Sequence, residues 1–342
     1  MNRLQYLIGE GTNPYKNIAV EEYLLMHTEP GTGILYLWQN RKTVVIGRNQ
    51  NAWRECRVEA LEADGGFLAR RMSGGGAVFH DLGNLNFTFL ARKEDYDLEK
   101  QTEVILRAVQ SFGIPARRTG RNDLTVKGRK FSGNAFYTTG DFCYHHGTVL
   151  IDADKQEMSK YLNVSREKLQ SKGVESVKSR VGNLSEWVPS LTVEQMRQAL
   201  ILAFGQVYGG TPEAILPEAL PKEKLEAGET HFSSWDWLYG RKIPFNAEAS
   251  GRYDWGEVQM RLEISEGIIR DAVVWTDTLD VELARIAEHL LCGLHYRDAS
   301  ISRVFDEAAQ KDEARKDMFH DLVRCLTEKK SGEERGSHGT AV

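Results

Sequence analysis

Residues 70–81 of this chain of 342 residues place two arginines directly before three consecutive glycines, in the string Arg-Arg-Met-Ser-Gly-Gly-Gly-Ala-Val-Phe-His-Asp. Consecutive glycines are costly to order, because each loses more backbone freedom on folding than any other residue. Such a run is useful where backbone N–H groups must approach an anionic ligand closely. Arg70 and Arg71 supply guanidinium groups, which bind phosphate or carboxylate through paired hydrogen bonds. The segment therefore predicts a phosphate or carboxylate site.

This segment differs from the common nucleotide-binding loops. The chain contains no Gly-Lys dipeptide, which excludes a Walker A loop, and the segment does not follow the Gly-x-Gly-x-x-Gly pattern. The glycines alone leave a second interpretation open, in which a glycine-rich hairpin bend lies beside two solvated arginines.

The complete string is more specific than its glycines, and it resembles the signature loop of the lipoate–protein ligase A family. Other segments resemble that family in the same order along the chain, and weaker similarity continues at residues 233–235 and 274–277. The resemblance therefore covers nearly the whole chain. The stronger matches are residues 37–40, 43–48, 120–124, 128–133, 145–148 and 176–184.

The resemblance implies a ligase that acts in two steps. Lipoate, with octanoate as an alternative acid, would attack the α-phosphate of ATP to give an acyl-AMP and diphosphate, while Mg²⁺ bridges the phosphate oxygens. The ε-amine of a carrier lysine would then attack the acyl carbon and release AMP. The implied carriers are the lipoyl domains of 2-oxoacid dehydrogenase acyltransferase subunits and the glycine-cleavage carrier protein. The implied enzyme is a cytoplasmic monomer.

The resemblance also assigns roles to residues in the matched segments. Lys130 corresponds to the family's lysine between the carboxylate and the α-phosphate, where a compact charge can follow negative charge as it moves. Arg71 corresponds to an adjacent phosphate or adenylate contact, and Asp123 is the nearest carboxylate that could hold Mg²⁺. The nucleotide-binding stretch consists of Gly74, Gly75, Gly76, Ala77, Val78 and Phe79.

A second set of residues is assigned to the lipoyl group by the same resemblance. Trp38 corresponds to a pocket residue, whereas the apolar residues 44–46 are better explained by core packing. His80 has two open interpretations, as a group that orients the acyl chain or a phosphate and as a structural histidine. The lipoyl-binding set is Trp38, Arg71, Ser73, His80, Lys130, Ser132, Gly133 and His146.

Strand periodicity gives two further expectations for these side chains. Lys130 and Ser132 should share one face of a strand, because side chains alternate. Adjacent His145 and His146 should point to opposite faces, so we interpret both as structural rather than as zinc ligands, with His146 near the site. Arg180 has two interpretations, as a carrier contact and as a partner in a surface ion pair.

Three other functions remain open on the sequence. An octanoyltransferase of the same fold would carry the acyl group on a nucleophilic cysteine, but residues 120–123 lack one, and Cys56 and Cys143 have no evident activating base. A biotin–protein ligase shares the adenylate chemistry, but its Gly-Arg-Gly-Arg loop is missing. A non-catalytic paralogue would bind lipoyl-AMP or a carrier without turnover, and it would not need both Lys130 and the glycine string.

The elements that position these residues are expected to form a mixed α+β catalytic domain over residues 1–246. Hairpin-like strands with interspersed helices favour a largely antiparallel sheet over a doubly wound parallel one. The resemblance implies the biotin/lipoate ligase fold, which is similar to class II synthetases. Strands are expected at residues 4–8, 34–38, 43–46, 66–70, 85–90, 124–126, 129–132 and 147–152, and helices at 17–27, 100–112 and after 192.

Four of these predictions are specific about local structure. Residues 34–38 and 43–46 are expected to pair with each other. Residues 85–90 alternate in polarity, so this strand is expected to pack chiefly on one face. Lys127-Gly128 predicts a hairpin turn, and Thr192 with Gln195, three positions later, predicts a capping box at a helix start.

Residues 250–342 are expected to form a second, smaller α+β unit, which the resemblance implies to be the family's accessory domain. Alternating polarity and a Glu-Gly turn predict a hairpin over residues 258–276. Asp280 is expected to cap the next helix. Apolar spacing at residues 318–323 marks a last helix, and residues 329–342 are expected to form a frayed tail.

Composition limits the possible functions. The chain has 44 basic and 49 acidic residues, a net charge of −5, so it has no overall attraction to nucleic acid and any anion site must be local. No apolar run reaches the ~18 residues of a membrane span, and the N-terminus does not resemble a signal peptide. The four cysteines form no Cys-x-x-Cys pair, which favours a reducing, cytosolic compartment.

Overall fold

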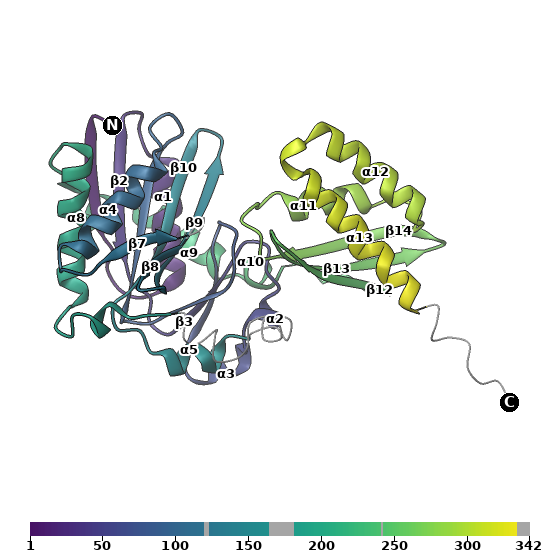
Figure 1. The fold of residues 1–342 in the computed structure, drawn as a ribbon, viewed down its shortest axis with the longest axis horizontal. Coiled ribbons are helices and arrows are strands. Elements are labelled where there is room, and N and C mark those ends of the chain that lie inside the picture. Colours follow the sequence, from purple (N-terminus) through teal and green to yellow (C-terminus); the bar gives the residue numbers. More distant parts are fainter. Residues whose placement is uncertain (120–122, 164–180, 241, 334–342) are drawn as a thin grey trace. The chain divides into compact units, whose positions relative to one another are not determined.

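The computed structural model describes residues 1–119, 123–163, 181–240 and 242–333, which are drawn as ribbons in Figure 1. The chain forms two compact units. The first comprises Met1–Arg48 and Ala52–Tyr239, and the second comprises Asn49–Asn51 and Gly240–Val342. No helix within the described ranges has the length and apolar character needed to cross a membrane.

Among the described residues, the first unit is built on an eight-stranded sheet with the order β11-β1-β2-β6-β10-β9-β8-β7. β1 runs parallel to β2 and β11, and the other neighbouring pairs are antiparallel. The sheet is therefore mixed and largely antiparallel, which confirms the predicted fold class. Its strands are β1 (Arg3–Ile8), β2 (Thr32–Trp38), β6 (Asn84–Arg92), β7 (Ala116–Thr119), β8 (Asp123–Val126), β9 (Arg129–Thr139), β10 (Phe142–Leu150) and β11 (Glu213–Ala214).

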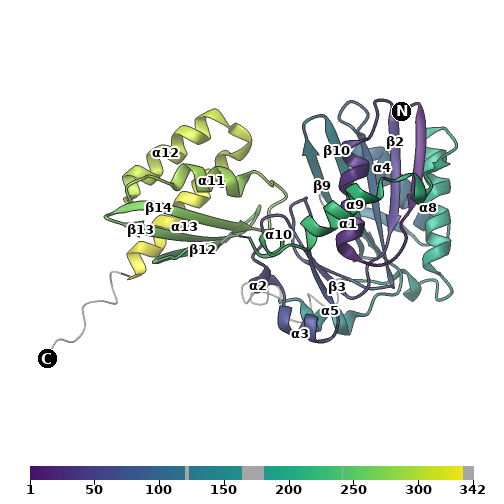
Figure 2. The same cartoon turned by 180° about the vertical axis from the view of Figure 1, so that it is seen from behind.

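Helices cover both faces of this sheet, as Figures 1 and 2 show from opposite sides. α4 (Leu98–Gln110) and α8 (Val193–Tyr208) lie on one face, and α1 (Pro14–Met26) and α9 (Lys222–Ser233) lie on the other. The layer under α4 and α8 is apolar, and burial of each large side chain there contributes roughly 1.5–3 kcal/mol. Its buried members include Leu35, Leu37, Phe87, Phe89, Phe131, Val149, Val104, Ile105, Leu200 and Phe204.

The face under α1 is also buried. The prediction that residues 85–90 pack chiefly on one face is wrong, because Asn84, Asn86 and Thr88 are at most 1% exposed. β6 lies between β2 and β10 inside the sheet, so helices cover both of its faces. One face of the sheet is therefore apolar, and the other carries buried polar side chains.

A small sheet with the order β4-β3-β5 packs against the polar face of the large sheet. The predicted pairing of residues 34–38 with 43–46 is wrong. β2 is flanked on both edges by β1 and β6, and the chain enters the small sheet through residues 40–42, where Lys42 has a φ of 28°. The elements here are β3 (Thr43–Ile46), β4 (Phe67–Arg70) and β5 (Val78–His80), with α2 (Ala52–Glu55), α3 (Val58–Ala63), α5 (Lys155–Tyr161) and α10 (Trp235–Tyr239).

The hairpin between β8 and β9 forms as predicted. Lys127 and Gly128 have φ values of 48° and 81°, and two consecutive residues with positive φ are typical of the tightest turns between antiparallel strands. Glycine adopts this conformation without the steric cost that a side chain would bring.

β9 contains a bulge that changes the direction of its side chains. Thr125 lies opposite Lys130, whereas the preceding residue Leu124 lies opposite Ser132, so β9 has one extra residue at this point. Partners in an antiparallel pair share a face, and adjacent residues of β8 point to opposite faces. The expectation that Lys130 and Ser132 share a face is therefore wrong.

Two other predictions concern the ends of elements. β10 begins at Phe142, earlier than the predicted residue 147, so it includes both His145 and His146. The capping box at the start of α8 is confirmed. The Gln195 N–H donates to Thr192 Oγ1 at 3.2 Å, and the Thr192 N–H donates to Gln195 Oε1 at 2.9 Å.

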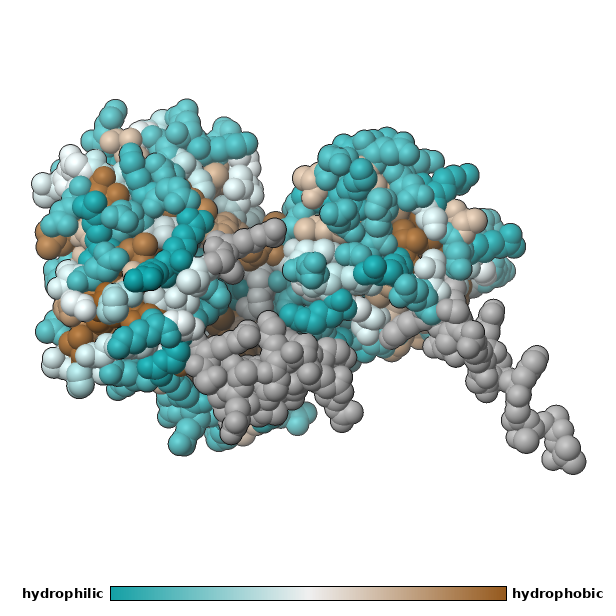
Figure 3. Space-filling model, viewed as in Figure 1, coloured by the Kyte–Doolittle hydropathy of each residue, from teal (hydrophilic) through white to brown (hydrophobic). Residues whose placement is uncertain are grey.

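The second unit packs a three-stranded antiparallel sheet against helices, and the predicted hairpin turn connects its second and third strands. Figure 3 shows a mainly hydrophilic surface with scattered apolar residues in this view, as expected for a chain with 27% charged residues. The elements of the second unit are β12 (Ala247–Tyr253), β13 (Gly256–Ser265), β14 (Ile268–Thr276), α11 (Leu283–Leu291), α12 (Asp298–Lys311) and α13 (Lys316–Glu333). Short 3₁₀ turns lie at Leu184–Glu186, Pro217–Ala219 and Glu313–Arg315.

The helices of the second unit differ from the prediction in two ways. α12 was not predicted, although Ile301, Phe305 and Ala309 recur at every fourth residue on its buried side. α13 continues to Glu333, so the tail predicted from residue 329 begins too early. Residues 334–342 lie outside the described ranges.

Asp280 does not cap α11. The N-cap is Glu282, and Asp280 accepts a hydrogen bond from the Glu282 N–H at 3.0 Å. The Asp280 carboxylate also pairs with the Arg315 guanidinium at 2.5 Å. It therefore fixes the loop before α11 and joins it to the start of α13.

Replacing Thr192 with alanine is expected to lower the free energy of unfolding of the first unit by about 1 kcal/mol, because the cap hydroxyl is lost. Urea denaturation followed by circular dichroism measures this change. Thr192→Ser keeps the hydroxyl and should retain most of the stability. An equal loss in both variants would show that the capping hydrogen bond is not the cause.

Candidate functional site

Polar side chains are buried between α1, the large sheet and the glycine segment. We call Glu21, Ser73, His80, Asn84, Asn86, Thr88 and His146 the polar layer; each is less than 10% exposed. Buried polar atoms are normally hydrogen-bonded. Several atoms of this layer have no partner in the part of the chain that the structure describes, which points to a polar ligand or water. They are Glu21 Oε2, His80 Nε2, Asn84 Oδ1 and Asn86 Nδ2.

A chain of hydrogen bonds crosses the polar layer from α1 to the glycine segment. Thr88 Oγ1 donates to Glu21 Oε1 at 2.7 Å, and His146 Nδ1 lies 2.8 Å from the same oxygen. His146 Nε2 lies 2.8 Å from Ser73 Oγ. The Trp38 indole N–H donates to Thr88 Oγ1 at 3.2 Å. The structure therefore brings together three residues of the predicted lipoyl set, Trp38, Ser73 and His146.

Arg71 fixes the shape of the glycine segment. Its Nη2 donates to the carbonyls of Gly74 and Gly76, each at 2.8 Å, and its Nε donates to Ser73 Oγ at 3.1 Å. Its Nη1 donates to the Val45 carbonyl at 3.3 Å. Burial lowers the pKa of Arg71 to about 10, so the side chain stays protonated at neutral pH. Any contact with a phosphate would be additional to this backbone-holding role.

Arg70 is also buried but binds other carbonyls. Its guanidinium donates to the carbonyls of Leu238 at 2.6 Å, Trp237 at 2.8 Å and Arg48 at 2.9 Å. Burial lowers its pKa to about 9. The alternative of two solvated arginines is therefore wrong, and Arg70 joins β4 to the end of α10.

The glycine segment passes another strand at very close range. A Cβ added to Gly47, just after β3, would lie 2.1 Å from the carbonyl oxygen of Gly75, whose φ is 95°. A Cβ added to Gly76 would meet no atom within 4 Å. Residues 75–78 are partly exposed, whereas the Phe79 side chain is buried in an apolar cluster. Phe79 could therefore reach a ligand only through its backbone.

Lys130 lies on the same side of β9 as Gly133. A Cβ added to Gly133 would lie 2.9 Å from Lys130 Cε. The Lys130 ammonium pairs with Asp123 Oδ1 at 2.6 Å, and the two side chains are 37% and 40% exposed. Exposed ion pairs contribute little stability, so this one can open at small cost. Ser132, opposite Leu124, is turned to the apolar face and is not brought into the polar layer.

Strand register relates Lys130 to the polar layer. Ala135 pairs with His146, and Gly133 lies two residues before Ala135 on β9. Residues two apart in a strand share a face. Lys130, Gly133 and His146 therefore share the face of the large sheet that carries the polar layer.

Asp123 forms no metal site with other side chains that the structure describes. No group of three His, Cys, Asp or Glu residues suited to a metal occurs within the described ranges. The Asp123 carboxylate is also engaged by Lys130. A Mg²⁺ ion at this position would have to take most of its ligands from nucleotide phosphates and water.

His145 and His146 point to opposite faces of the sheet, as expected. His145 Nε2 lies 2.8 Å from Asn134 Oδ1, and its ring packs against Phe87 and Phe136. Burial lowers the pKa of His145 to about 3, so this imidazole is neutral. His145 is a structural residue of the apolar face.

His80 lies at the end of β5, close to the glycine segment, and is 4% exposed. Its Nδ1 lies 3.2 Å from Asn40 Nδ2, and its ring is edge-on to Trp38 with the centroids 6.2 Å apart. Burial, with smaller contributions from the neighbouring Arg71 and His146, lowers the pKa of His80 to about 3. The side chain is therefore a neutral member of the polar layer.

Glu21, which lies at the centre of the hydrogen-bonded chain, is not among the residues predicted from the sequence. A signal for it was available, since Glu21 follows Ile18 by three positions and precedes Leu25 by four. That spacing places its carboxylate on the buried side of the predicted helix. The predicted segments at 120–122 and 176–180, which include Arg180, lie outside the described residues.

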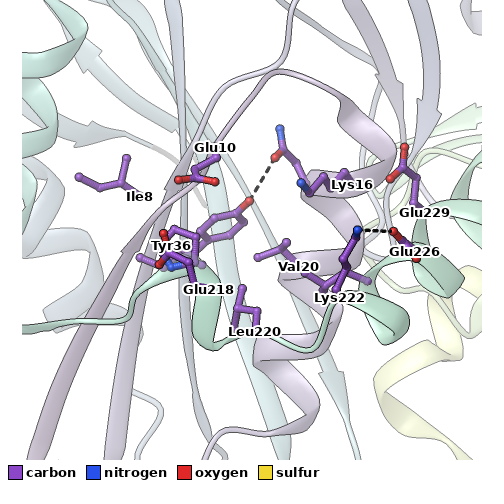
Figure 4. A pocket seen from close by; sticks show the side chains of 15 residues that line it. Ile8, Glu10, Lys16, Val20, Tyr36, Glu218, Leu220, Lys222, Glu226 and Glu229 are labelled. Atoms are coloured by element: carbon purple, nitrogen blue, oxygen red, sulfur yellow. Dashed lines mark hydrogen bonds and ion pairs between the residues drawn. The ribbon is translucent and has the colours of Figure 1, made fainter.

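A separate cavity of about 400 Å³ lies between α1, the end of β1 and α9 (Figure 4). Tyr36 and Leu220 line it, and charged side chains, including Glu10 and Lys222, surround it. None of the residues predicted for the site lines this cavity. It is therefore distinct from the polar layer, although Asn17 and Tyr36 on its wall are hydrogen-bonded to each other.

Gly47→Ala is expected to destabilise the first unit by about 1–3 kcal/mol, because its Cβ would collide with the Gly75 carbonyl. Gly76→Ala is the matched control, since its Cβ would meet open space. Thermal unfolding of the two variants tests this difference. Equal melting temperatures would show that the crossing of the two segments is loose.

Two family models match this chain. The model described as lipoyl protein ligase A/B catalytic domain matches residues 13–205, and the one described as bacterial lipoate protein ligase C-terminus matches residues 242–326. Among curated proteins, lipoate-protein ligase A from Psychrobacter cryohalolentis is 41% identical over 313 residues, which cover 89% of this chain and 92% of that protein.

Solved structures give the same result. The lipoate complex of LipL1 from P. falciparum is 30% identical with a TM-score of 0.79, and the match covers 92% of this chain and 99% of that one. A structure of the bipartite lipoate protein ligase system of Thermoplasma acidophilum is 27% identical with a TM-score of 0.61, covering 71% of this chain and 99% of that one. The chain therefore belongs to the lipoyl protein ligase A/B family.

Proposed function

We propose that this chain is an ATP-dependent lipoate–protein ligase. The carboxylate of lipoate attacks the α-phosphate of ATP, the bond to diphosphate breaks, and lipoyl-AMP forms. The amine of a carrier lysine then attacks the acyl carbon, the bond to AMP breaks, and an amide remains on the lysine. The proposal rests on the placement of Lys130 and the buried polar layer on one face of a sheet in a chain of this family. Several atoms of that layer have no partner among the described residues.

The nucleotide is proposed to bind at the glycine segment. Arg71 holds the carbonyls of Gly74 and Gly76, and the amide groups of residues 75–77, which precede β5, are proposed as donors toward phosphate oxygens. The partial exposure of these residues supports this role. Preorganised donors of this kind stabilise developing charge because they need no reorientation during the reaction.

The acyl chain of lipoate is proposed to lie against Trp38. The ring of Trp38 is held by the bond from its indole N–H to Thr88 and by stacking on Tyr36 at 5.9 Å. Apolar neighbours in the same cluster, such as Leu90 and Met72, suit an alkyl chain. The similar LipL1 protein was solved with lipoate. Octanoate, which offers the same carboxylate and alkyl chain, is proposed as a second acid substrate.

Lys130 is proposed to change partners during the reaction. In the structure its ammonium pairs with the Asp123 carboxylate. When the lipoate carboxylate approaches the α-phosphate, the ammonium can turn to these anions, because the pair with Asp123 is partly exposed and weak. A positive charge there stabilises the negative charge that builds on the phosphate oxygens.

Further parts of the proposal concern the metal ion and the carriers. Mg²⁺ would enter with the nucleotide and neutralise phosphate charge, and Asp123 is the side chain proposed to contact it. The carriers are proposed to be lipoyl domains of 2-oxoacid dehydrogenase acyltransferases and the glycine-cleavage carrier protein. The lipoyl domain named with the T. acidophilum ligase supports the first of these.

A thioester route through cysteine is disfavoured by the described cysteines of the first unit. Cys56 is buried, and burial raises its pKa to about 12, so it is a thiol and not a nucleophilic thiolate. Cys143 is 3% exposed and lies two residues before His145, so it faces the apolar side of the sheet and not the polar layer.

A variant with all four cysteines replaced by alanine is therefore expected to keep its rate of ATP-dependent lipoylation within about threefold of the parent. Mass spectrometry of a lipoyl domain after incubation with ATP, Mg²⁺ and lipoate measures this rate. Circular dichroism controls for folding, because three of the cysteines are buried. Complete loss in a folded variant would favour an acyl–cysteine intermediate.

Lys130→Gln is expected to lower lipoate-dependent exchange of labelled diphosphate into ATP by about 10²-fold or more, because a group that stabilises the transition state is lost. Lys127→Gln removes an exposed lysine at the tip of the same hairpin and should leave exchange unchanged. Equal rates for K130Q and the parent would exclude Lys130 from the chemical step.

The same exchange assay separates the ligase from a non-catalytic paralogue. A ligase incorporates label into ATP only when lipoate is present, whereas a binding protein gives no exchange but holds lipoyl-AMP tightly. Adding biotin in place of lipoate distinguishes a biotin ligase. Label incorporation with biotin alone would overturn the proposed substrate.

A further inference from the structure

We propose that Asn40 is a positioning residue that holds His80 as the Nε2–H tautomer, so that His80 donates a hydrogen bond to an anionic oxygen of the bound substrate. This inference rests on the proposed function, because the oxygen belongs to the lipoate carboxylate or to a phosphate of ATP. The tautomer itself follows from hydrogen-bond directions in the ligand-free protein.

Hydrogen bonds link Asn17 to Asn40 and Asn40 to His80. A backbone carbonyl determines which group donates in each of them. Asn17 Nδ2 lies 2.8 Å from the Gln39 carbonyl oxygen, which can only accept. This contact fixes which end of the Asn17 amide is nitrogen. The same nitrogen lies 2.9 Å from Asn40 Oδ1, and both of its N–H groups are thereby used as donors. The Tyr36 hydroxyl donates to Asn17 Oδ1 at 3.3 Å, a bond drawn in Figure 4.

The orientation of Asn17 determines that of Asn40 and then of His80. Since Asn40 presents its oxygen to Asn17, its Nδ2 faces His80 Nδ1 at 3.2 Å. An amide N–H donates, so His80 Nδ1 must accept with its lone pair. A neutral imidazole with an accepting Nδ1 carries its proton on Nε2.

The imidazole of His80 does not become doubly protonated at neutral pH. Burial, together with the neighbouring Arg71 cation, lowers its pKa to about 3. Asn40 also offers no acceptor to an Nδ1–H group, because its oxygen is bonded to Asn17. The imidazole is therefore neutral and fixed in one tautomer.

The resulting Nε2–H group is a donor without an acceptor. Nε2 of His80 is buried and has no hydrogen-bond partner within the described ranges. A buried donor that stays unpaired is destabilising, so the site favours a ligand that supplies an acceptor. An N–H group forms a stronger hydrogen bond to an anionic oxygen than to a neutral one, and the neighbouring buried Arg71 cation also favours negative charge here.

Nitrogen-15 NMR of the histidine side chains in the intact, ligand-free protein tests the tautomer at neutral pH. His80 is assigned as the signal missing from the His80→Gln variant. The expected pattern is that of a neutral ring protonated at Nε2. A ring protonated at Nδ1, or at both nitrogens, would overturn the proposal. This measurement does not depend on ligase activity, so its failure is distinguishable from failure of the proposed function.

Asn40→Asp replaces the donating amide with a carboxylate of the same shape that only accepts. The His80 ring must then place a proton on Nδ1, which the NMR pattern reports. Lipoate-dependent ATP–diphosphate exchange is expected to fall by about 10- to 100-fold, which corresponds to one buried hydrogen bond. Asn246→Asp, an exposed site in the second unit, adds the same charge and should leave exchange unchanged.

Ligand titrations of the parent protein keep the test independent of how well N40D folds. Lipoate alone should shift the Nε2–H signal of His80 if the acceptor is the carboxylate. A non-hydrolysable α,β-methylene analogue of ATP should shift it if the acceptor is a phosphate. No shift with either ligand, although both bind, would overturn the donor role of His80. Unchanged exchange in a folded N40D with a reversed tautomer would overturn it as well.

Discussion

The rest of the site depends on one buried guanidinium, that of Arg71. Most of its hydrogen-bond acceptors come from the residues that directly follow it in the sequence. Arg71 holds two carbonyls of the glycine segment and the hydroxyl of Ser73. A buried cation without such acceptors would be very costly. The glycine backbone, which could otherwise adopt many conformations, is therefore fixed in one, and Ser73 is held beside His146. Glycine is needed here for close packing, because a Cβ on Gly47 would meet the Gly75 carbonyl.

The two faces of the large sheet have different roles. One contributes apolar packing, and the other carries the polar residues of the candidate site. The face under α4 and α8 is apolar and contains even His145 as a packed, neutral ring. The face under α1 holds a polar layer in which several atoms have no hydrogen-bond partner among the described residues. Lys130 differs from that layer, because it is partly exposed and paired with a carboxylate. The site thus combines rigid donors with one cation that can change partners, a combination suited to the proposed reaction at the α-phosphate followed by one at the acyl carbon.

Sequence patterns predicted those parts of the fold that local chemistry controls. The Lys127-Gly128 turn and the Thr192 cap depend on a few adjacent residues, and both formed as expected. The predicted pairing of β2 with β3 is wrong because the sheet neighbours of a strand can be distant in the sequence, as β6 is from β2. The β9 bulge depends on β8, and no pattern within β9 alone shows it. The polar face of β6 was missed because burial on two sides is a property of strand order.

The same limits apply to the candidate site. The glycine string and the Lys130 segment were found because their residue types are unusual and contiguous. Glu21 and Asn40 act through partners more than twenty positions away, so their roles were visible only in the folded chain. Arg71 was found, but as a ligand contact; the structure adds that its guanidinium organises the backbone.

Keeping two imidazoles neutral inside the first unit makes its stability sensitive to acid. His80 and His145 have folded-state pKa values of about 3, against an ordinary value of 6.5. Below about pH 6.5 these histidines bind protons in the unfolded chain but stay neutral in the folded chain. The free energy of unfolding therefore decreases as the pH is lowered from about 6.5 toward 3. Acidification over that range therefore pulls the equilibrium toward the unfolded chain, whereas above pH 6.5 neither ring contributes to pH dependence.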